Sequence, residues 1–376
     1  MKIGIEAQRI FRPKKHGMDI VALETIKHLQ QIDLSNQYFV FVKDDVDNKI
    51  LEPTDNFEIV KIKSPSYLLW EQWELPKKVK SVKLDLLHCT SNTAPLNLSC
   101  PLVLTLHDII FLEGKASSTA TRYQQLGRIY RRWNVPQAVA KAKKIITVSD
   151  YENQVIAAHF KERAKDIITV HNGAGAHFKK IDDHAALELF RTKYKLPESF
   201  TFFIGNTDPK KNVRNVLAAF KLLHHQYNQQ IHLVMPDLNE TYFASLIKDL
   251  GLEELRKFIV LTGYIANKDL PMLYNLATIF LYPSLRESFG IPILEAMNCG
   301  TAVLTSNTSS MPEVAGDAAL FVNPKDENDI AQKWNSLLID KSLRDELSHK
   351  GIQQSAKFSW LLTAEKVKNI YETLEL

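Results

Sequence analysis

The sequence predicts an α/β protein with two doubly wound domains, each built on a parallel sheet. Short apolar runs of strand character alternate with helical patterns through almost the whole chain, which is typical of parallel sheets covered by helices on both faces. The alternation occurs in two series, with a loop-rich stretch at about 175–198 between them. The chain has 376 residues, which is too long for one compact core and suits two ordinary domains.

The first series predicts an N-terminal domain of residues 1–178. Helical patterns at 19–32 and 151–160 separate some of its strands. The predicted strands are 2–7 (KIGIEA), 38–43 (YFVFVK), 58–63 (EIVKIK), 84–89 (LDLLHC), 101–108 (PLVLTLHD), 144–149 (KIITVS) and 167–173 (IITVHNG).

The second series predicts a C-terminal domain of residues 179–357. Helical patterns follow most of its strands, at 215–227, 242–251, 269–277 and 329–340. The predicted strands are 200–206 (FTFFIGN), 230–236 (QIHLVMP), 258–264 (FIVLTGY), 278–284 (TIFLYPS), 302–307 (AVLTSN) and 319–324 (ALFVNP).

Ligands of open parallel sheets bind outside the carboxyl ends of the strands. Two such domains facing each other by these edges would enclose a cleft, and this is the architecture we expect. The polar or glycine-containing segments that directly follow predicted strands are His107-Asp108, Ser149, Asn172-Gly173, Gly205 to Asn212, and Glu287.

Composition indicates a soluble globular protein, with 45% hydrophobic and 24% charged residues. The formal charge of +4 gives no reason to expect a nucleic-acid partner. No apolar run approaches the roughly 18–20 residues that span a bilayer, and the N-terminus lacks the apolar core of a signal peptide. Three cysteines without metal-ligand spacing fit reduced thiols, so we expect a cytoplasmic protein.

The stretch SLRESFGIPILEAMNCGT (284–301) places Glu287 and Glu295 around a predicted helix start. Pro292 favours the first helical turn, and Gly300 ends the helix. Free amides at about 288–293 would attract phosphate, whereas the carboxylates would accept hydrogen bonds from hydroxyl groups. A ligand with both features is a nucleotide sugar. The alternative is that both glutamates only favour the helix dipole.

A second candidate anchor follows the strand 200–206. Gly205 leads into a turn with Pro209, and Lys210 and Lys211 stand just before a predicted helix. Lysines in this position can neutralise a diphosphate, with help from the amides of the helix start. The alternative is a solvated turn with two exposed lysines.

Segment 259–334, which contains both glutamates, closely resembles the group 1 (family 4) retaining glycosyltransferases of the GT-B fold. Glu287 and Glu295 match the E-x7-E motif of that family, and GNTDPKKN (205–212) resembles its strand-glycine-lysine segment. In the N-terminal half LDLLHCTSN, LTLHDIIF, IITVSDYE and IITVHNG match in order, so the resemblance covers nearly the whole chain.

The resemblance implies a role for individual residues. Glu295 would contact the ribose hydroxyls of the donor, and Glu287 would face its sugar with amides near Phe289 and Gly290. Lys211 would neutralise the diphosphate. The remaining implied positions are Gly17 in a loop over the phosphates, His107 facing the donor sugar, and Gly205, Asn206, Lys210, Ser288 and Ile291 in the donor site.

Departures from the family pattern leave the donor open. Asn206 stands where some members carry a phosphate-binding arginine, and Ser288 stands where glycine is common. The final helix of the family returns to the N-terminal domain, so residues 358–376 are expected to complete it.

The reaction implied is retaining transfer of a sugar from a nucleoside diphosphate to a saccharide or lipid-linked acceptor, in surface-glycan synthesis. No metal or cofactor is expected, because the D-x-D at Asp45 and Asp47 lies in a polar run typical of a solvated turn. The alternatives are a nucleotide-sugar epimerase or phosphorylase of the same fold, and a catalytically silent glycan- or nucleotide-binding protein.

Two segments combine aromatic and basic residues. Segment 65–83 has Trp70 and Trp73 with four lysines, and segment 122–144 is rich in arginine and lysine. Such surfaces can lie on anionic lipid headgroups, which would place the protein at the inner face of the membrane. The alternative is that the tryptophans pack inside the domain and the cations are solvated.

Overall fold

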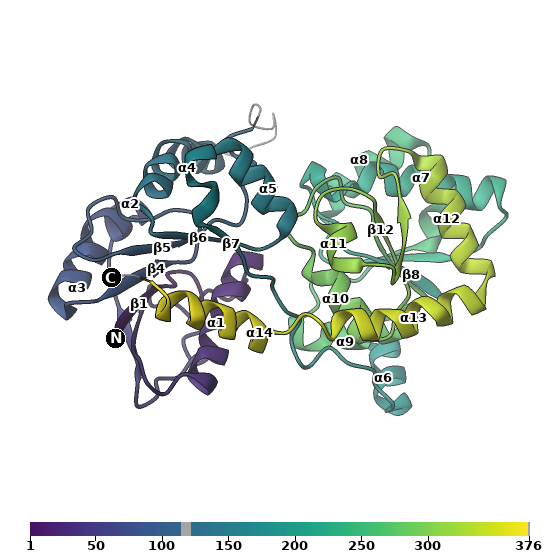
Figure 1. Ribbon diagram of the computed structural model, residues 1–376. Coiled ribbons are helices and arrows are strands. Elements are labelled where there is room, and N and C mark those ends of the chain that lie inside the picture. Colours follow the sequence, from purple (N-terminus) through teal and green to yellow (C-terminus); the bar gives the residue numbers. More distant parts are fainter. Residues whose placement is uncertain (114–121, 375–376) are drawn as a thin grey trace. The chain divides into compact units, whose positions relative to one another are not determined.

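The computed structural model describes residues 1–113 and 122–374, and the chain divides into two compact units (Figure 1). Unit 1 comprises Met1–Asn172 and Trp360–Leu376, and unit 2 comprises Gly173–Ser359. The predicted boundaries after residues 178 and 357 lie a few residues from the observed ones. Ala174 forms a parallel bridge with Ser359, which ties both connecting segments to unit 2.

Unit 1 contains a parallel sheet of seven strands in the order β3-β2-β1-β4-β5-β6-β7. Its inner strands β1, β4 and β5 are almost fully buried, as expected for a sheet covered on both faces. The strands are β1 (Lys2–Glu6), β2 (Gln37–Val42), β3 (Phe57–Lys61), β4 (Leu86–Cys89), β5 (Leu102–Thr105), β6 (Lys144–Thr147) and β7 (Ile167–Thr169).

One face of this sheet is covered by a helix from each end of the chain. The C-terminal α14, drawn in yellow, lies beside α1, and both contribute side chains to one apolar core (Figure 1). Residues Trp360–Leu376 therefore belong to unit 1. The helices of unit 1 are α1 (Gly17–Ile32), α2 (Tyr67–Leu69), the π-helix η1 (Trp70–Glu74), α3 (Leu75–Val82), α4 (Arg122–Lys141), α5 (Asp150–His159), the 3₁₀-helix η2 (Lys161–Asp166) and α14 (Trp360–Glu372).

Unit 2 contains a parallel sheet of six strands in the order β10-β9-β8-β11-β12-β13. The strands are β8 (Phe200–Phe203), β9 (His232–Met235), β10 (Ile259–Leu261), β11 (Ile279–Tyr282), β12 (Val303–Ser306) and β13 (Ala319–Val322). The helices are α6 (His184–Tyr194), η3 (Pro209–Lys211), α7 (Val213–Gln226), α8 (Glu240–Leu250), η4 (Glu253–Phe258), η5 (Asn267–Asp269), α9 (Leu270–Leu276), α10 (Ile291–Asn298), α11 (Met311–Ala315), α12 (Glu327–Ile339) and α13 (Lys341–Ser355).

The strand order reverses direction once in each sheet. In unit 1 the chain moves outward from β1 to β3 and then returns to place β4 on the other side of β1. In unit 2 the reversal brings β11 beside β8. The connections that leave two neighbouring strands at such a point run to opposite sides, which opens a crevice for ligands at the carboxyl edge.

The prediction of a loop-rich connection at 175–198 was wrong in part, because α6 occupies its centre. The Asp183 side chain accepts a hydrogen bond from the Ala186 amide at 2.9 Å and so caps the helix start. Leu187 and Phe190 are the buried side chains of this helix. With only two buried positions, its periodicity is too weak to stand out in the sequence.

Within residues 1–113 and 122–374, no helix is long and apolar enough to cross a membrane.

The docking of α14 onto unit 1 depends partly on a buried hydrogen bond. The Tyr371 hydroxyl lies 2.6 Å from Nδ1 of His88, and burial lowers the pKa of His88 to about 3, so the imidazole is neutral. Tyr371→Phe leaves this nitrogen without its partner. We expect the free energy of unfolding to fall by about 1–2 kcal/mol, measured by urea denaturation. An unchanged unfolding midpoint would show that this contact contributes nothing to docking.

Candidate functional site

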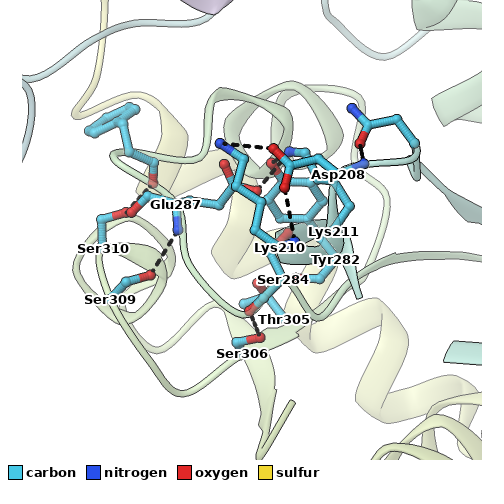
Figure 2. Close-up of polar contacts among 12 residues, drawn as sticks. Asp208, Lys210, Lys211, Tyr282, Ser284, Glu287, Thr305, Ser306, Ser309 and Ser310 are labelled. Carbon is cyan, nitrogen blue, oxygen red and sulfur yellow. Dashed lines mark hydrogen bonds and ion pairs between the residues drawn. The ribbon is translucent and has the colours of Figure 1, made fainter. Parts of the chain in front are cut away.

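Two loops of unit 2 meet at the carboxyl edge of neighbouring strands. One follows β8 and carries Lys210 and Lys211, and the other follows β11 and carries Glu287 (Figure 2). The Leu285 amide donates to the Lys210 carbonyl at 2.8 Å, so the backbone itself joins the loops. The two anchors predicted separately from the sequence therefore belong to one site.

The loop after β8 has a shape that only certain residues allow. A Cβ at Gly205 would lie 2.6 Å from the Phe203 ring, so this position must be glycine unless that ring moves. Asn206 is exposed, and its side chain accepts from the Asp208 amide at 2.8 Å. Asp208 accepts in turn from the Lys210 amide at 3.1 Å. This chain of polar turns sets the path of the backbone into the two lysines.

Asn212 fixes the end of this turn and the start of α7. It has a φ of 63°, a left-handed conformation that asparagine tolerates better than most residues. Its buried amide group donates to the carbonyl oxygens of Pro283, at 2.9 Å, and Pro324, at 2.6 Å. The side chain therefore joins the loops that follow β8, β11 and β13.

Lys211 makes the central contact of the site. Its ammonium lies 2.7 Å from Oε1 of Glu287 and 2.8 Å from the Tyr282 hydroxyl (Figure 2). Both charged side chains are largely buried. Lys210 is more exposed and lies 4.0 Å from Asp208.

The field at this position is positive. Burial by itself would raise the pKa of Glu287, but the ammonium groups of Lys211 and Lys210 outweigh burial and hold that pKa below its usual range. Glu287 is therefore ionised at neutral pH and forms a true ion pair with Lys211.

Two serines, Ser309 and Ser310, form hydrogen bonds with the backbone of the Glu287 loop. The Glu287 amide donates to Oγ of Ser309 at 3.1 Å, and the Ser310 hydroxyl donates to the carbonyls of Glu287, at 2.9 Å, and Phe289, at 2.8 Å. Ser309 has a φ of 53°, which is uncommon for a serine. These contacts fix where the Glu287 backbone lies.

Gly290 begins α10 with a φ of 110°, a value that strongly favours glycine. This confirms the predicted helix over the second half of the motif, with Ile291 and Pro292 in its first turn. The Phe289 ring is buried against Phe358, with ring centroids 5.8 Å apart. The ring of Phe289 is therefore not available to a ligand. Ser288 and Ile291 are half-buried beside it.

Glu295 lies inside α10 and is buried. Its Oε2 accepts a hydrogen bond of 2.8 Å from the Tyr274 hydroxyl, which comes from α9. Burial raises the pKa of Glu295 to about 7, and the Tyr274 bond offsets this only in part. The Tyr282 hydroxyl, whose pKa is raised mainly by burial, also feels the charge of both Glu287 and Glu295. Tyr274 thus contacts Glu295, whereas Lys211 contacts Glu287.

The two predicted residues of unit 1 lie at the carboxyl edge of its sheet. His107 follows β5 and is buried, its Nε2 donating to the Thr90 carbonyl at 3.0 Å. Burial lowers the pKa of His107, so the ring is neutral and its Nδ1 is an acceptor. Gly17 opens α1, and no heavy atom lies within 4 Å of the place where a Cβ would be.

Sequence reasoning missed the four side chains that hold the charged residues in place. Tyr274 and Tyr282 lie in stretches that look like ordinary apolar helix and strand, and Ser309 and Ser310 look like loop residues. One indication of these contacts is present in the sequence: the Tyr282 hydroxyl in the apolar run TIFLYPS, directly before the glutamate motif.

A separate surface of unit 1 carries exposed apolar side chains, and we call it the aromatic groove. It is a groove of about 440 Å³ lined by Leu68, Gln72, Trp73, Leu96, Asn97, Tyr130 and Trp133. Trp73 and Trp133 are each 53% exposed, and Leu126 and Ile129 on the same helix as Trp133 are 66% and 64% exposed. Trp70 is buried, so of the two predicted tryptophans one packs inside and one faces solvent.

Hydrogen bonds make the floor of the aromatic groove rigid. The buried Glu71 carboxylate accepts from the hydroxyls of Tyr67, at 2.7 Å, and Tyr130. Gln72 donates to the Ala94 carbonyl at 3.0 Å and accepts from the Leu96 amide at 3.0 Å. The exposed apolar rim is thus held on a fixed support.

Both halves of the chain match models of known protein families. Residues 187–354 match the model described as glycosyl transferases group 1, and residues 16–175 match glycosyltransferase family 4. O-antigen chain mannosyltransferase B of Escherichia coli is 32% identical over 276 residues, which are 72% of this chain and 70% of that protein. The serotype-specific mannosyltransferase WbdA of Escherichia coli is 34% identical over 230 residues, 60% of this chain but only 28% of WbdA.

Solved structures share the fold at low sequence identity. The Anabaena protein HepE, crystallised with UDP and glucose, has a TM-score of 0.75 and 18% identity, with all of both chains covered. WaaG, a glycosyltransferase involved in lipopolysaccharide biosynthesis, has a TM-score of 0.75 and 16% identity over 99% of this chain and 100% of that one. These neighbours confirm the predicted fold class.

The raised pKa of Glu295 makes a prediction about stability. A carboxyl whose pKa is about 7 in the folded chain and about 4.5 in the unfolded chain stabilises the fold below pH 4.5, and this contribution is lost as pH rises through 7. Between pH 5 and 8 we expect the free energy of unfolding of the wild type to fall by up to about 3 kcal/mol, measured by urea denaturation. This fall should be absent in Glu295→Gln. Parallel pH profiles for the two proteins would contradict the raised pKa.

Proposed function

The chain belongs to the group 1 glycosyltransferases, and on that premise we propose that unit 2 binds a nucleoside diphosphate sugar whose sugar is transferred with retention of configuration. The contact that supports this most directly is the ion pair of Lys211 and Glu287 at the β8–β11 edge. In this proposal the lysine is the cation for a diphosphate, and the carboxylate beside it accepts from sugar hydroxyls. HepE, of the same fold, was crystallised with UDP-glucose.

The donor is held by three kinds of contact in this proposal. Lys211 and the more exposed Lys210 neutralise the diphosphate, and amides at the start of α10 add hydrogen bonds. Glu287 accepts from hydroxyls of the donor sugar, and Glu295 accepts from those of the ribose. The remaining donor-site positions of unit 2 in this proposal are Gly205, Asn206, Ser288, Phe289, Gly290 and Ile291. The roles of Gly17 and His107, which belong to unit 1, stay predictions from the family resemblance.

We further propose that the acceptor attacks on the face from which the diphosphate leaves. The acceptor oxygen forms a bond to the anomeric carbon while the bond from that carbon to the phosphate oxygen breaks. The departing phosphate oxygen takes the acceptor's proton. Lys211 stabilises the charge that develops on the diphosphate, so catalysis is positioning together with electrostatic stabilisation. No metal or cofactor takes part in this scheme.

The acceptor in this proposal is a saccharide or lipid-linked glycan of surface-polysaccharide synthesis. Relatives such as O-antigen chain mannosyltransferase B act in that kind of pathway by their names. An epimerase would need no acceptor, and a phosphorylase would use inorganic phosphate as the acceptor. Products of the reaction with a saccharide acceptor, and their anomeric configuration, distinguish these possibilities.

We also propose that the aromatic groove and its surroundings rest on an anionic lipid surface at the inner face of the membrane. Segment 122–144 carries seven arginines and lysines and no acidic residue. Lys77, Lys78 and Lys80 of α3 are exposed. Exposed tryptophan and leucine beside basic side chains suit the boundary between headgroups and acyl chains.

Replacement of Lys211 tests the donor site. In Lys211→Ala the charge on the leaving diphosphate is no longer stabilised, so turnover should fall by a factor of about 10² or more. The measurement is nucleoside diphosphate release from a panel of nucleotide sugars, with and without saccharide acceptors. Lys341→Ala removes a 77% exposed lysine of unit 2 and is the control. Near-normal turnover of a folded Lys211→Ala protein would refute the assignment.

Replacement of the groove tryptophans tests membrane contact. Binding to vesicles that contain phosphatidylglycerol should be strong at low salt and weak in ~0.5 M NaCl, because exposed charges are screened. Trp73→Ala/Trp133→Ala should weaken that binding at least tenfold in co-sedimentation. Leu189→Ala/Ile339→Ala removes two exposed apolar side chains of unit 2 and should change nothing. Equal vesicle binding by all three proteins, or no binding by the wild type, would refute the proposed membrane contact.

A further inference from the structure

The hydroxyl of Tyr282 is placed to hold the Lys211 ammonium. Tyr282 is the last residue of β11 and is 1% exposed. Its oxygen accepts from Nζ of Lys211 at 2.8 Å, and the same Nζ lies 4.8 Å from the centre of the Tyr282 ring. The tyrosine thus contacts the ammonium through its hydroxyl group (Figure 2).

These contacts leave a defined part of the ammonium for a ligand. A lysine ammonium has three N–H donors. Glu287 uses one and Tyr282 uses another, so one N–H is left for a ligand. A free lysine side chain samples many rotamers, and two fixed acceptors reduce that freedom before a ligand arrives.

The phenol also stays neutral, which this role requires. Burial, followed by the charge of Glu287, raises the pKa of the Tyr282 hydroxyl well above its ordinary value. A neutral phenol accepts from the lysine without adding a second negative charge beside a diphosphate. A second carboxylate in its place would repel the ligand.

We infer that Tyr282 is a positioning residue for sugar transfer: its hydroxyl fixes the Lys211 ammonium in the direction of the departing diphosphate. This inference rests on the proposed function of the donor site. Tyr282 lies in a strand, outside the two anchor loops, and its burial alone would not indicate a part in the reaction.

The ring of Tyr282 has a packing role that can be separated from the hydroxyl. It stacks on Phe280 with ring centroids 5.6 Å apart, and its carbonyl accepts from the Thr305 hydroxyl at 2.9 Å. Tyr282→Phe keeps the ring, the stack and the backbone bond. It removes only the hydroxyl, which contacts Lys211 and also interacts with Glu287 and Ser284, so the strand and its surroundings should remain folded.

The first test compares ligands with and without phosphate. For Tyr282→Phe we expect a fivefold to tenfold weaker affinity for the nucleoside diphosphate of the active donor and an unchanged affinity for the corresponding nucleoside, by isothermal titration. With the sugar donor as substrate, kcat should fall fivefold to twentyfold. KM should rise or fall by no more than a factor of three. A general loss of structure would weaken the binding of both the nucleoside diphosphate and the nucleoside.

A double-mutant cycle tests whether Tyr282 acts through Lys211. In a Lys211→Met background, Tyr282→Phe should change nucleoside diphosphate affinity by less than 1.5-fold, because the group that it positions is gone. The same fivefold to tenfold loss in both backgrounds would overturn the inference. Tyr227→Phe is the matched control, since Tyr227 follows the far end of α7, about 20 Å of helix from Lys211.

The outcomes separate the inference from the function on which it rests. A wild type that binds no nucleoside diphosphate would overturn both. A wild type that binds and transfers normally, with a Tyr282→Phe variant indistinguishable from it, would overturn the inference and leave the donor site intact.

Discussion

The site in unit 2 depends on one buried contact between opposite charges, that of Lys211 with Glu287. Each charge would be costly to bury alone, and each is acceptable because the other lies 2.7 Å away. The contact also sets the electrostatic sign of the site. Glu287 stays ionised despite its burial because the ammonium groups of Lys211 and Lys210 lower its pKa. In the function that we propose, the phosphates of the donor contact the lysines and its hydroxyl groups contact the carboxylate.

Parallel topology is what brings these two charges together. They are 76 residues apart in the chain, but their loops leave adjacent strands at the point where the order of the sheet reverses. Local backbone chemistry then completes the alignment. Gly205 avoids a clash with Phe203, Asn212 ties three loops together, and Gly290 makes the turn into α10.

Much of this could be predicted from the sequence, because its signals are periodic or positional. Strands of parallel sheets are buried runs, and all thirteen predicted runs are strands. Glu287 and Lys211 lie in loops that follow strands, at the edge where ligands of parallel sheets bind. Tyr274 and Tyr282 could not be predicted, because a tyrosine in an apolar run looks the same whether its hydroxyl meets a carboxylate, an ammonium or solvent. The helix α6 was missed because only two of its side chains are buried.

The return of α14 to unit 1 has a consequence for biosynthesis. Ala364, Val367, Ile370 and Tyr371 belong to the core that also contains Ile3 and Ile5. On the ribosome, residues 1–172 are made before unit 2, but their core stays incomplete until α14 has been made. Unit 2 is one continuous stretch and has its whole core available earlier. The core of unit 1 is thus complete only after all of unit 2 has been synthesised.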